Sequence, residues 1–173
     1  ILLTPAGPET ILAEQLNNQL LSSENLNGVF KSVSVNIQVE QMDAPKTPLR
    51  ERLWEVPDQY SMSKDAFKKW FPHDPYGDEN NRAHWKTLSI AMQFTDSTRE
   101  NKTIRWPGKK LTPGWYRITY TYNGTSGKPV IAQQWMSISG NTPVNAPIQL
   151  FADKDIAEPG ESLNITVKTG WDK

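Results

Sequence analysis

The segment Val33-Ser34-Val35-Asn36-Ile37-Gln38-Val39 alternates strictly between apolar and polar residues, and it is the clearest structural signal in the sequence. Successive side chains of a β-strand point to opposite faces, so this period of two predicts a strand with one face on a core and the other in water. The turn signal Asn27-Gly28 stands shortly before it. We therefore expect residues 33–39 to form a half-buried strand.

The alternation returns in the second half of the chain. Leu88, Ile90 and Met92 alternate with small or polar residues and predict a strand with these three side chains on one face. A further strand follows the Pro-Gly turn at 113–114, and the return strand covers residues 130–138. One face of the strand after that turn is expected to carry Tyr116, Ile118, Tyr120 and Tyr122. Short strands separated by Gly and Pro turns favour an antiparallel sandwich over an α/β fold.

Two regions interrupt this pattern. In residues 1–23, leucines at 12, 16 and 20 recur at helical spacing, but the early prolines favour an extended or irregular segment. Residues 43–86 are rich in proline and charge, and we interpret them as an insertion between strands. Within it Ser63 is positioned to cap a short helix that Pro72 ends. The expected buried stripe of this helix is Ala66, Phe67, Trp70 and Phe71.

The bulk composition limits the classes of function. The 19 Lys and Arg residues balance 19 Asp and Glu residues, so the basic excess of a nucleic-acid-binding protein is missing. The absence of cysteine excludes disulfides, thiol nucleophiles and thiolate metal sites. No apolar run is long enough to span a bilayer as a helix. The 173 residues are enough for one domain of ordinary size and a part of a second.

The C-terminal part predicts the start of another domain. Residues 140–147 have the composition of a linker. After them come the apolar run 148–151, a Glu-Pro-Gly-Glu turn at 158–161 and an alternating strand over 163–167. We therefore expect a β-sandwich over 24–141 that contains the 43–86 insertion, followed by a linker and the first strands of a second sandwich over 142–173.

Several stretches resemble one protein family. Residues 48–58 and 67–80 are similar to a segment of large alpha-2-macroglobulin-like proteins of Bacteroidetes-type bacteria. Around them, Leu26-Asn27-Gly28 resembles the turn before that segment, Leu111–Ile118 a strand entry, and Ile148–Val167 the opening of the next macroglobulin-type domain. The resemblance covers about residues 26–170, and the 48–80 stretch is its specific part.

The resemblance implies a role as scaffold. Members of this family are strings of macroglobulin-type, immunoglobulin-like β-sandwiches, and many of them trap proteases after cleavage of a bait segment. Many carry an internal thioester made from a cysteine and a glutamine, which a chain without cysteine cannot contain. The family implies a periplasmic or outer-membrane-anchored parent whose targeting signal lies upstream. The partners would be neighbouring domains of the same polypeptide, and proteases at the level of the whole protein.

Three other interpretations compete with the structural role. The loop at residues 73–81 holds His73, Asp74, Asp78 and Glu79, which are possible cation ligands, but its spacing is not that of an EF-hand and a solvated acidic loop is the simpler interpretation. A hydrolase would need a cleft in which His73 or His84 meets acidic side chains. A glycan-binding or adhesive module could use a stacking platform made from Trp70, Trp85, Trp106, Trp115 and Trp135.

The sequence thus predicts a mostly β, immunoglobulin-like sandwich without catalytic activity. It assigns no catalytic, cofactor-binding or metal-binding residue and no cofactor. Buried tryptophans would favour the structural role, and exposed, coplanar tryptophans would favour glycan binding. Trp106 is the ring of most interest, because it lies in a predicted turn where exposure of a large aromatic side chain would need an explanation.

Overall fold

The computed structural model is mostly β and describes residues 1–108, 110–124, 127–140, 148–152, 154 and 156–169. It divides into a first unit of residues 1–43 and 87–141 and a second unit of residues 44–86 and 142–173. The expected linker at 140–147 lies almost wholly outside the described residues. The elements of the first unit are β1 (Leu2–Ala6), β2 (Thr10–Leu12), η1 (Ala13–Asn18), β3 (Leu20–Glu24), β4 (Ser34–Met42), β5 (Thr87–Ser97), β6 (Gly114–Asn123) and β7 (Pro129–Ser139).

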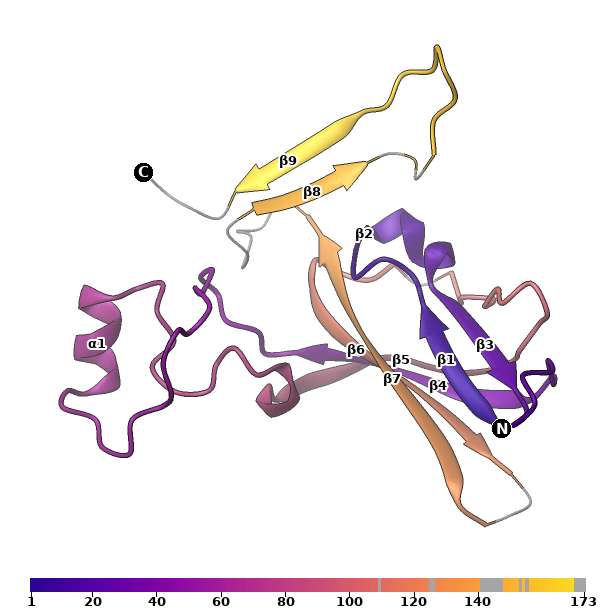
Figure 1. Ribbon diagram of the computed structural model, residues 1–173, viewed down its shortest axis with the longest axis horizontal. Coiled ribbons are helices and arrows are strands. Elements are labelled where there is room, and N and C mark those ends of the chain that lie inside the picture. The colour runs from indigo at the N-terminus through magenta and orange to yellow at the C-terminus, as the bar shows by residue number, and fades with distance from the viewer. Residues whose placement is uncertain (109, 125–126, 141–147, 153, 155, 170–173) are drawn as a thin grey trace. The chain divides into compact units, whose positions relative to one another are not determined.

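A five-stranded sheet organises the first unit (Figure 1), with the strand order β2-β7-β6-β4-β5. β2 pairs with β7 in parallel, and the other three pairs are antiparallel. β1 and β3 form a separate antiparallel pair. The expectation of a mostly β chain is therefore confirmed, with antiparallel pairing dominant and one sheet of mixed direction.

The core lies on one face of the five-stranded sheet. Val35, Ile37 and Val39 of β4 are almost completely buried, as the strict alternation of this strand predicts. The predicted face of β6 is also confirmed, since Tyr116, Ile118 and Tyr120 are buried beside them. The remaining buried members of this core are Leu3, Ile11, Leu16, Leu21, Met92, Ile104, Leu111, Met136 and Ile138.

Residues 1–23 take part in this core. β1 and β3 contribute Leu3 and Leu21, and the 3₁₀ helix η1 contributes Leu16. Strands flank this short helix, and Leu12, Leu16 and Leu20 lie in β2, η1 and β3 respectively. The leucine spacing of four therefore does not mark the face of one amphipathic helix. The side chain of Gln15 accepts a hydrogen bond from the Leu12 amide at 2.9 Å, which fixes the entry into this turn.

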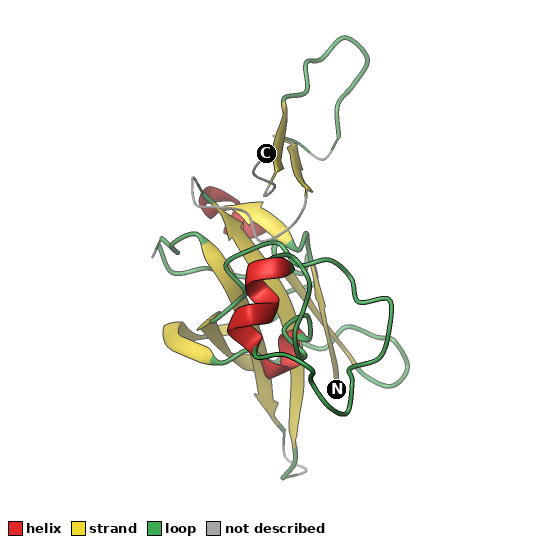
Figure 2. Cartoon of the chain, turned by 90° about the vertical axis from the view of Figure 1, so that its left-hand side faces the viewer, coloured by secondary structure: helices red, strands yellow, loops and turns green. Residues whose placement is uncertain are grey.

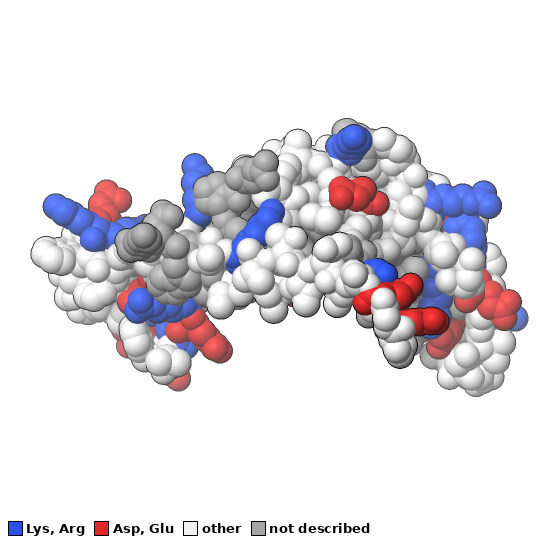
Figure 3. Space-filling view, turned by 90° about the horizontal axis from the view of Figure 1, so that it is seen from above, with Lys and Arg blue, Asp and Glu red and all other residues white. Residues whose placement is uncertain are grey.

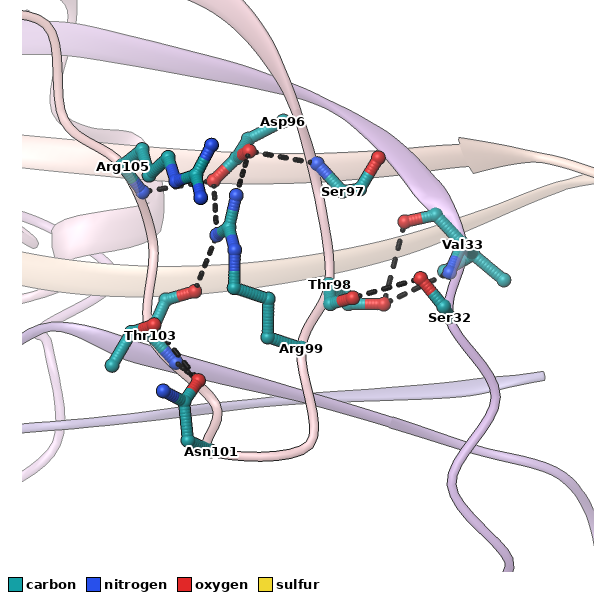
Figure 4. A network of polar contacts seen from close by, with 9 residues as sticks. All are labelled: Ser32, Val33, Asp96, Ser97, Thr98, Arg99, Asn101, Thr103 and Arg105. Atoms are coloured by element: carbon teal, nitrogen blue, oxygen red, sulfur yellow. Dashed lines mark hydrogen bonds and ion pairs between the residues drawn. The ribbon is translucent and has the colours of Figure 1, made fainter.

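Buried hydroxyl groups connect the β1–β3 pair with the sheet. Ser23 of β3 is fully buried, and its Oγ lies 2.6 Å from Oγ1 of Thr98, which follows β5. Thr98 Oγ1 also accepts a hydrogen bond from the Val33 amide at 2.9 Å, and Ser32 Oγ donates to the Thr98 carbonyl (Figure 4). Buried polar groups need such partners, so this network sets how the chain before β4 and the chain after β5 meet β3.

One strand differs from its predicted pattern. β5 pairs with β4 in a register that shifts between Val39 and Glu40, where Val39 faces Met92 but Glu40 faces Ile90. This shift leaves Ala91 without a partner in β4, and a second shift between Gln41 and Met42 leaves Leu88 without one, so the alternation of β5 is interrupted twice. Met92 is therefore buried, while Leu88 and Ile90 are more than half exposed, so the prediction that the three share one face is wrong.

In the second unit, residues 44–86 are mainly loop around α1 (Lys64–Trp70) and the 3₁₀ turn η2 (Arg82–His84) (Figure 2). The predicted N-cap is confirmed, because Ser63 Oγ accepts a hydrogen bond from the Ala66 amide at 3.3 Å. The predicted buried stripe is wrong: no residue of α1 is buried, and Trp70 is 73% exposed. A helix of two turns is too short to pack a full stripe unless a neighbouring element covers it.

The second unit also contains β8 (Ile148–Ala152) and β9 (Ile165–Thr169), an antiparallel pair. Leu150 faces Val167 and Ala152 faces Ile165 across this pair. Both strands lie where the sequence places an apolar run and an alternating segment, with the Pro-Gly turn between them. The two predicted strands of this region are therefore confirmed.

Candidate functional site

The acidic loop at residues 73–81 pairs its carboxylates with basic side chains of the insertion. Asp78 Oδ2 lies 2.6 Å from His84 Nδ1, and Glu79 Oε1 lies 3.0 Å from Lys64 Nζ. The part of the chain that the structure describes contains no group of three or more His, Cys, Asp or Glu side chains able to hold a metal ion. The geometry therefore favours a loop held by local ion pairs over a cation site.

Glu79 shows how this loop is stabilised. Burial alone would raise the pKa of its carboxyl group, but hydrogen bonds from Lys64 and from the Gly77 amide outweigh that effect and leave the pKa below its ordinary value. The Gly77 amide donates to Glu79 Oε2 at 2.7 Å, and the Glu79 carbonyl accepts from the indole of Trp85 at 2.8 Å. Glu79 thus orders the loop around it.

The two histidines do not meet in an enclosed cleft. His73 Nδ1 lies 2.9 Å from the Pro48 carbonyl, a contact that ties the loop to the start of the insertion. His84 and its partner Asp78 both have more than half of their side chains exposed. Water screens such a pair, so its contribution to stability is at most about 1 kcal/mol.

Three of the five tryptophans proposed as a platform, Trp106, Trp115 and Trp135, belong to the first unit. The register places Trp115 opposite Ser137 and Trp135 opposite Arg117, so both rings lie on the face of the sheet away from the core. Trp106 instead packs against Phe94 on the core face, with ring centroids 5.5 Å apart in an edge-to-face arrangement. Because these three rings lie on opposite faces, they do not form a shared stacking surface.

A pocket that the sequence did not indicate lies within the insertion. Tyr60 and Tyr76 stack with their ring centroids 4.1 Å apart, and Phe67 meets Tyr76 edge-on at 5.4 Å. These three rings, together with Arg52, Trp54 and Met62, line a hollow of about 180 Å³. We call this hollow the aromatic pocket. Its lining residues come from positions 52–76, so it is built within one continuous stretch of chain.

Arg52 joins the two sides of the aromatic pocket. Its Nη2 donates hydrogen bonds to the carbonyl oxygens of Pro75 and Gly77. A guanidinium group has five N–H donors, and these two bonds use only one of its three nitrogens. Among the residues that the structure describes, no carboxylate pairs with Arg52. The pocket therefore carries a half-buried cation whose charge is not neutralised by a neighbour.

Large apolar side chains are exposed around the aromatic pocket. Trp54 is 61% exposed although it lines the pocket, and Tyr60 and Met62 are also classed as exposed. The same stretch exposes Leu53, Val56, Trp70 and Phe71. Contiguous exposed apolar surface on a protein marks an interaction site more often than isolated residues do. A local sequence signal existed: Leu53-Trp54 and Val56 are apolar residues set in a charged, proline-rich stretch.

The surface charge has no dominant sign. Lys and Arg side chains are interspersed with Asp and Glu in the view of Figure 3, consistent with the formal net charge of zero. Within the described residues no helix is long and apolar enough to cross a membrane. No protein-family model matches this chain, and no curated protein or solved structure matches it either.

Proposed function

We propose that this chain is a non-catalytic structural segment of a large alpha-2-macroglobulin-like protein that traps or inhibits proteases. In this proposal the first unit is a macroglobulin-type, immunoglobulin-like sandwich, and 142–173 holds the first strands of the next one. The resemblance of residues 48–58 and 67–80 to that family supports the proposal, as does a mostly β first unit with a core between a strand pair and a larger sheet.

The observation that carries the proposal is the apolar face of the β8–β9 pair. Ile148, Leu150, Ile165 and Val167 are each between 60% and 65% exposed. The register places Leu150 opposite Val167, and both side chains lie on the same face of the pair as Ile165. An isolated two-stranded hairpin is at best marginally stable in water, so this face needs further strands to cover it. Strands of a following sandwich domain would provide that cover.

The remaining parts of the proposal follow from the same family. The parent protein would lie in the periplasm or be anchored to the outer membrane. Neighbouring domains of the same polypeptide would be the direct partners of this chain, and proteases would be partners of the whole molecule. The even balance of 19 basic and 19 acidic residues supports the exclusion of nucleic acid from these partners.

An adhesive module of a cell-surface protein is the second candidate. The exposed aromatic residues of the insertion, Trp54 and Trp70 above all, favour it, because aromatic rings supply much of the binding energy of adhesive surfaces. This candidate does not require a parent of great length. The size of the native polypeptide therefore separates it from the first proposal.

The test is the length and behaviour of the native protein. An antibody raised against this chain is used to blot membrane and periplasmic fractions of the source cells. A band many times larger than 19.6 kDa is expected, and the isolated parent should retain added trypsin in a complex that still cleaves small peptide substrates but no longer cleaves casein. A band near 19.6 kDa, or a large parent that leaves casein cleavage unchanged, contradicts the proposal.

A further inference from the structure

We propose that the aromatic pocket binds a polypeptide segment that places one large apolar side chain in the hollow and a neighbouring carboxylate on Arg52. This inference goes beyond the structural role proposed above, because a scaffold domain needs no ligand of its own. It rests on the size of the pocket, on the unneutralised charge of Arg52, on the preformed walls and on the exposed apolar surface around them.

The volume of the pocket indicates a side chain rather than a whole small molecule. Pockets for drug-sized ligands and cofactors measure about 300–1,000 Å³. The aromatic pocket measures about 180 Å³, and four of its lining residues, Trp54, Tyr60, Phe67 and Tyr76, are aromatic. Aromatic walls favour an apolar or aromatic occupant through burial and edge-to-face contact. One large apolar side chain therefore fits this space.

The charge of Arg52 selects the group beside that side chain. Both of its hydrogen bonds come from Nη2 and go to the neutral carbonyl groups of Pro75 and Gly77. Nη1 and Nε have no hydrogen bond to any residue that the structure describes, although the side chain is half-buried. A half-buried cation forms its strongest hydrogen bonds with an anionic acceptor, since charge-assisted hydrogen bonds are about twice as strong as neutral ones. A carboxylate is the anion that polypeptides carry most often.

The walls of the pocket are held in place before any ligand arrives. The Tyr76 hydroxyl donates to the Met62 carbonyl at 2.8 Å, and the Tyr60 ring stacks on the Tyr76 ring. Arg52 links the start of the insertion to the Pro75–Gly77 turn. A preformed site avoids the entropic cost of ordering loops on binding, and this raises affinity for a given contact area.

The surroundings of the pocket indicate a polypeptide as the source of the ligand. Further apolar side chains of the same stretch are exposed: Leu53 precedes Trp54 in the chain, and the Phe71 ring lies 5.1 Å from the ring of Phe67, which lines the pocket. A single small carboxylate would leave them uncovered. Aromatic residues, Met and Arg are the types that protein interfaces concentrate. A neutral glycan would leave the Arg52 charge without a counter-charge, so we assign the site to an acidic, apolar peptide segment.

Peptide titrations of the ¹⁵N-labelled 173-residue chain test this assignment. The probe is Ac-Gly-Asp-Phe-Asp-Gly-NH₂, and the matched controls replace both Asp by Asn or replace Phe by Ala. We expect the acidic Phe peptide to shift amide signals of residues 52–62 and 75–77, with a Kd on the order of 1 mM. Each control peptide should bind at least about 10-fold more weakly. Raising NaCl from 20 to 500 mM should weaken the acidic Phe peptide several-fold.

Protein variants locate the site independently of the peptide chemistry. Arg52→Gln should weaken binding about 10-fold. Because Arg52 also holds the Pro75–Gly77 turn, Trp54→Ala is the second variant; this exposed side chain can be removed without loss of core packing, and binding should fall at least about 5-fold. Trp70→Ala removes a ring of the same unit that is still more exposed than Trp54 and does not line the pocket, and it should leave the Kd unchanged.

Four results would overturn the inference. They are equal binding of the Asn and Asp peptides, insensitivity of binding to salt, shifts confined to residues outside 52–77, and absence of any shift at 10 mM acidic peptide. Shifts of the pocket amides by maltohexaose at lower concentration than by the acidic peptide would assign the site to glycans instead. None of these outcomes bears on the size of the parent protein, so the structural role proposed above is tested independently of this inference.

Discussion

Replacement of Asp96 by Asn should destabilise the first unit in a way that depends on pH. Asp96 lies near the end of β5, and both of its oxygens face the guanidinium group of Arg99 (Figure 4). Oδ1 lies 2.7 Å from Arg99 Nη2, and Oδ2 lies 2.8 Å from Nη1. The amides of Ser97 and Arg105 donate to the same carboxylate at 2.9 and 2.8 Å.

The size of the effect follows from the pKa of this carboxyl group. The Arg99 hydrogen bonds lower the pKa of Asp96 from 3.8 to about 2; burial opposes this change, and the two backbone amides add to it. The Asp96 side chain is only 13% exposed, so solvent screens the pair weakly. The pKa difference corresponds to about 2 kcal/mol of stability at neutral pH. Because the folded-state pKa is the lower one, this stabilisation is present above about pH 4 and is lost as the pH falls through about 2.

The assay is urea denaturation followed by tryptophan fluorescence, at pH 7 and at a series of lower pH values. Asp96→Asn should lower the free energy of unfolding by about 2 kcal/mol at pH 7. The difference between the variant and the wild type should shrink toward zero near pH 2, where the wild-type carboxylate is protonated. Asp58→Asn is the matched control, since it removes one negative charge at an exposed position of the insertion.

Two results would refute the reasoning about Asp96. A loss below about 0.5 kcal/mol at pH 7 would mean that the carboxylate is no better stabilised in the folded state than an exposed one. A loss that stays constant between pH 7 and pH 2 would mean that Asn disturbs packing rather than charge. An equal loss in Asp58→Asn would assign the effect to net charge instead of to the Arg99 contacts.

Three further substitutions test the packing of the first unit, each by urea denaturation. Gly7→Ala should lower the free energy of unfolding by more than about 1 kcal/mol, because Gly7 has a φ of +133° and an added Cβ would lie 2.6 Å from the Asn18 carbonyl oxygen. Unchanged stability would show that the turn adjusts to the added methyl group. Trp106→Phe should change stability by less than about 1 kcal/mol, because within the described residues the buried Trp106 Nε1 has no hydrogen-bond partner. A loss above about 3 kcal/mol would contradict this and would mean that the whole indole ring is needed for packing against the core. Ser23→Ala should lower the free energy of unfolding by about 1–3 kcal/mol, because Thr98 Oγ1 loses one of its buried hydrogen-bond partners. Hydrogen exchange at the Val33 amide, which donates to Thr98 Oγ1, should become faster, and unchanged slow exchange there would contradict the role of this network.

The strands of the central sheet were predictable because their signals are local. The alternation at Val33–Val39 places every second side chain on one face. The same alternation in β6 places Tyr116, Ile118 and Tyr120 on its buried face. The Ser63 cap was predictable for the same reason, since a cap needs only the hydroxyl and an amide three residues later.

Two predictions were wrong because they depend on features that alternation and helical spacing do not encode. Two register shifts between β4 and β5 interrupt the alternation of β5 and leave Leu88 and Ile90 exposed, although the spacing of these residues in the sequence is regular. The apolar spacing of α1 predicts a buried stripe, but burial depends on what lies opposite, and Trp70 is left 73% exposed.

The aromatic pocket could not have been predicted residue by residue. Its cation, Arg52, and its stacked ring, Tyr76, are separated by more than twenty residues of irregular chain, and no periodic pattern relates them. Their meeting depends on hydrogen bonds from Arg52 to backbone carbonyls, which any residue type can supply. Trp54 lines this pocket although it is not among the five tryptophans that the sequence suggests as a stacking platform.

Local patterns in the sequence are enough to predict that this chain is mostly β, that β4 and β6 bury one face each, and that residues 43–86 lie between two strands as a loop-rich segment. These properties follow from alternation, turn residues and proline content, all of which act over a few neighbouring residues. Three other properties depend on the three-dimensional fold: which tryptophans share a face, where the alternation of β5 is interrupted, and that Arg52 lies beside an aromatic pocket. Those outcomes depend on contacts between residues distant in the chain, whose energies no local pattern specifies.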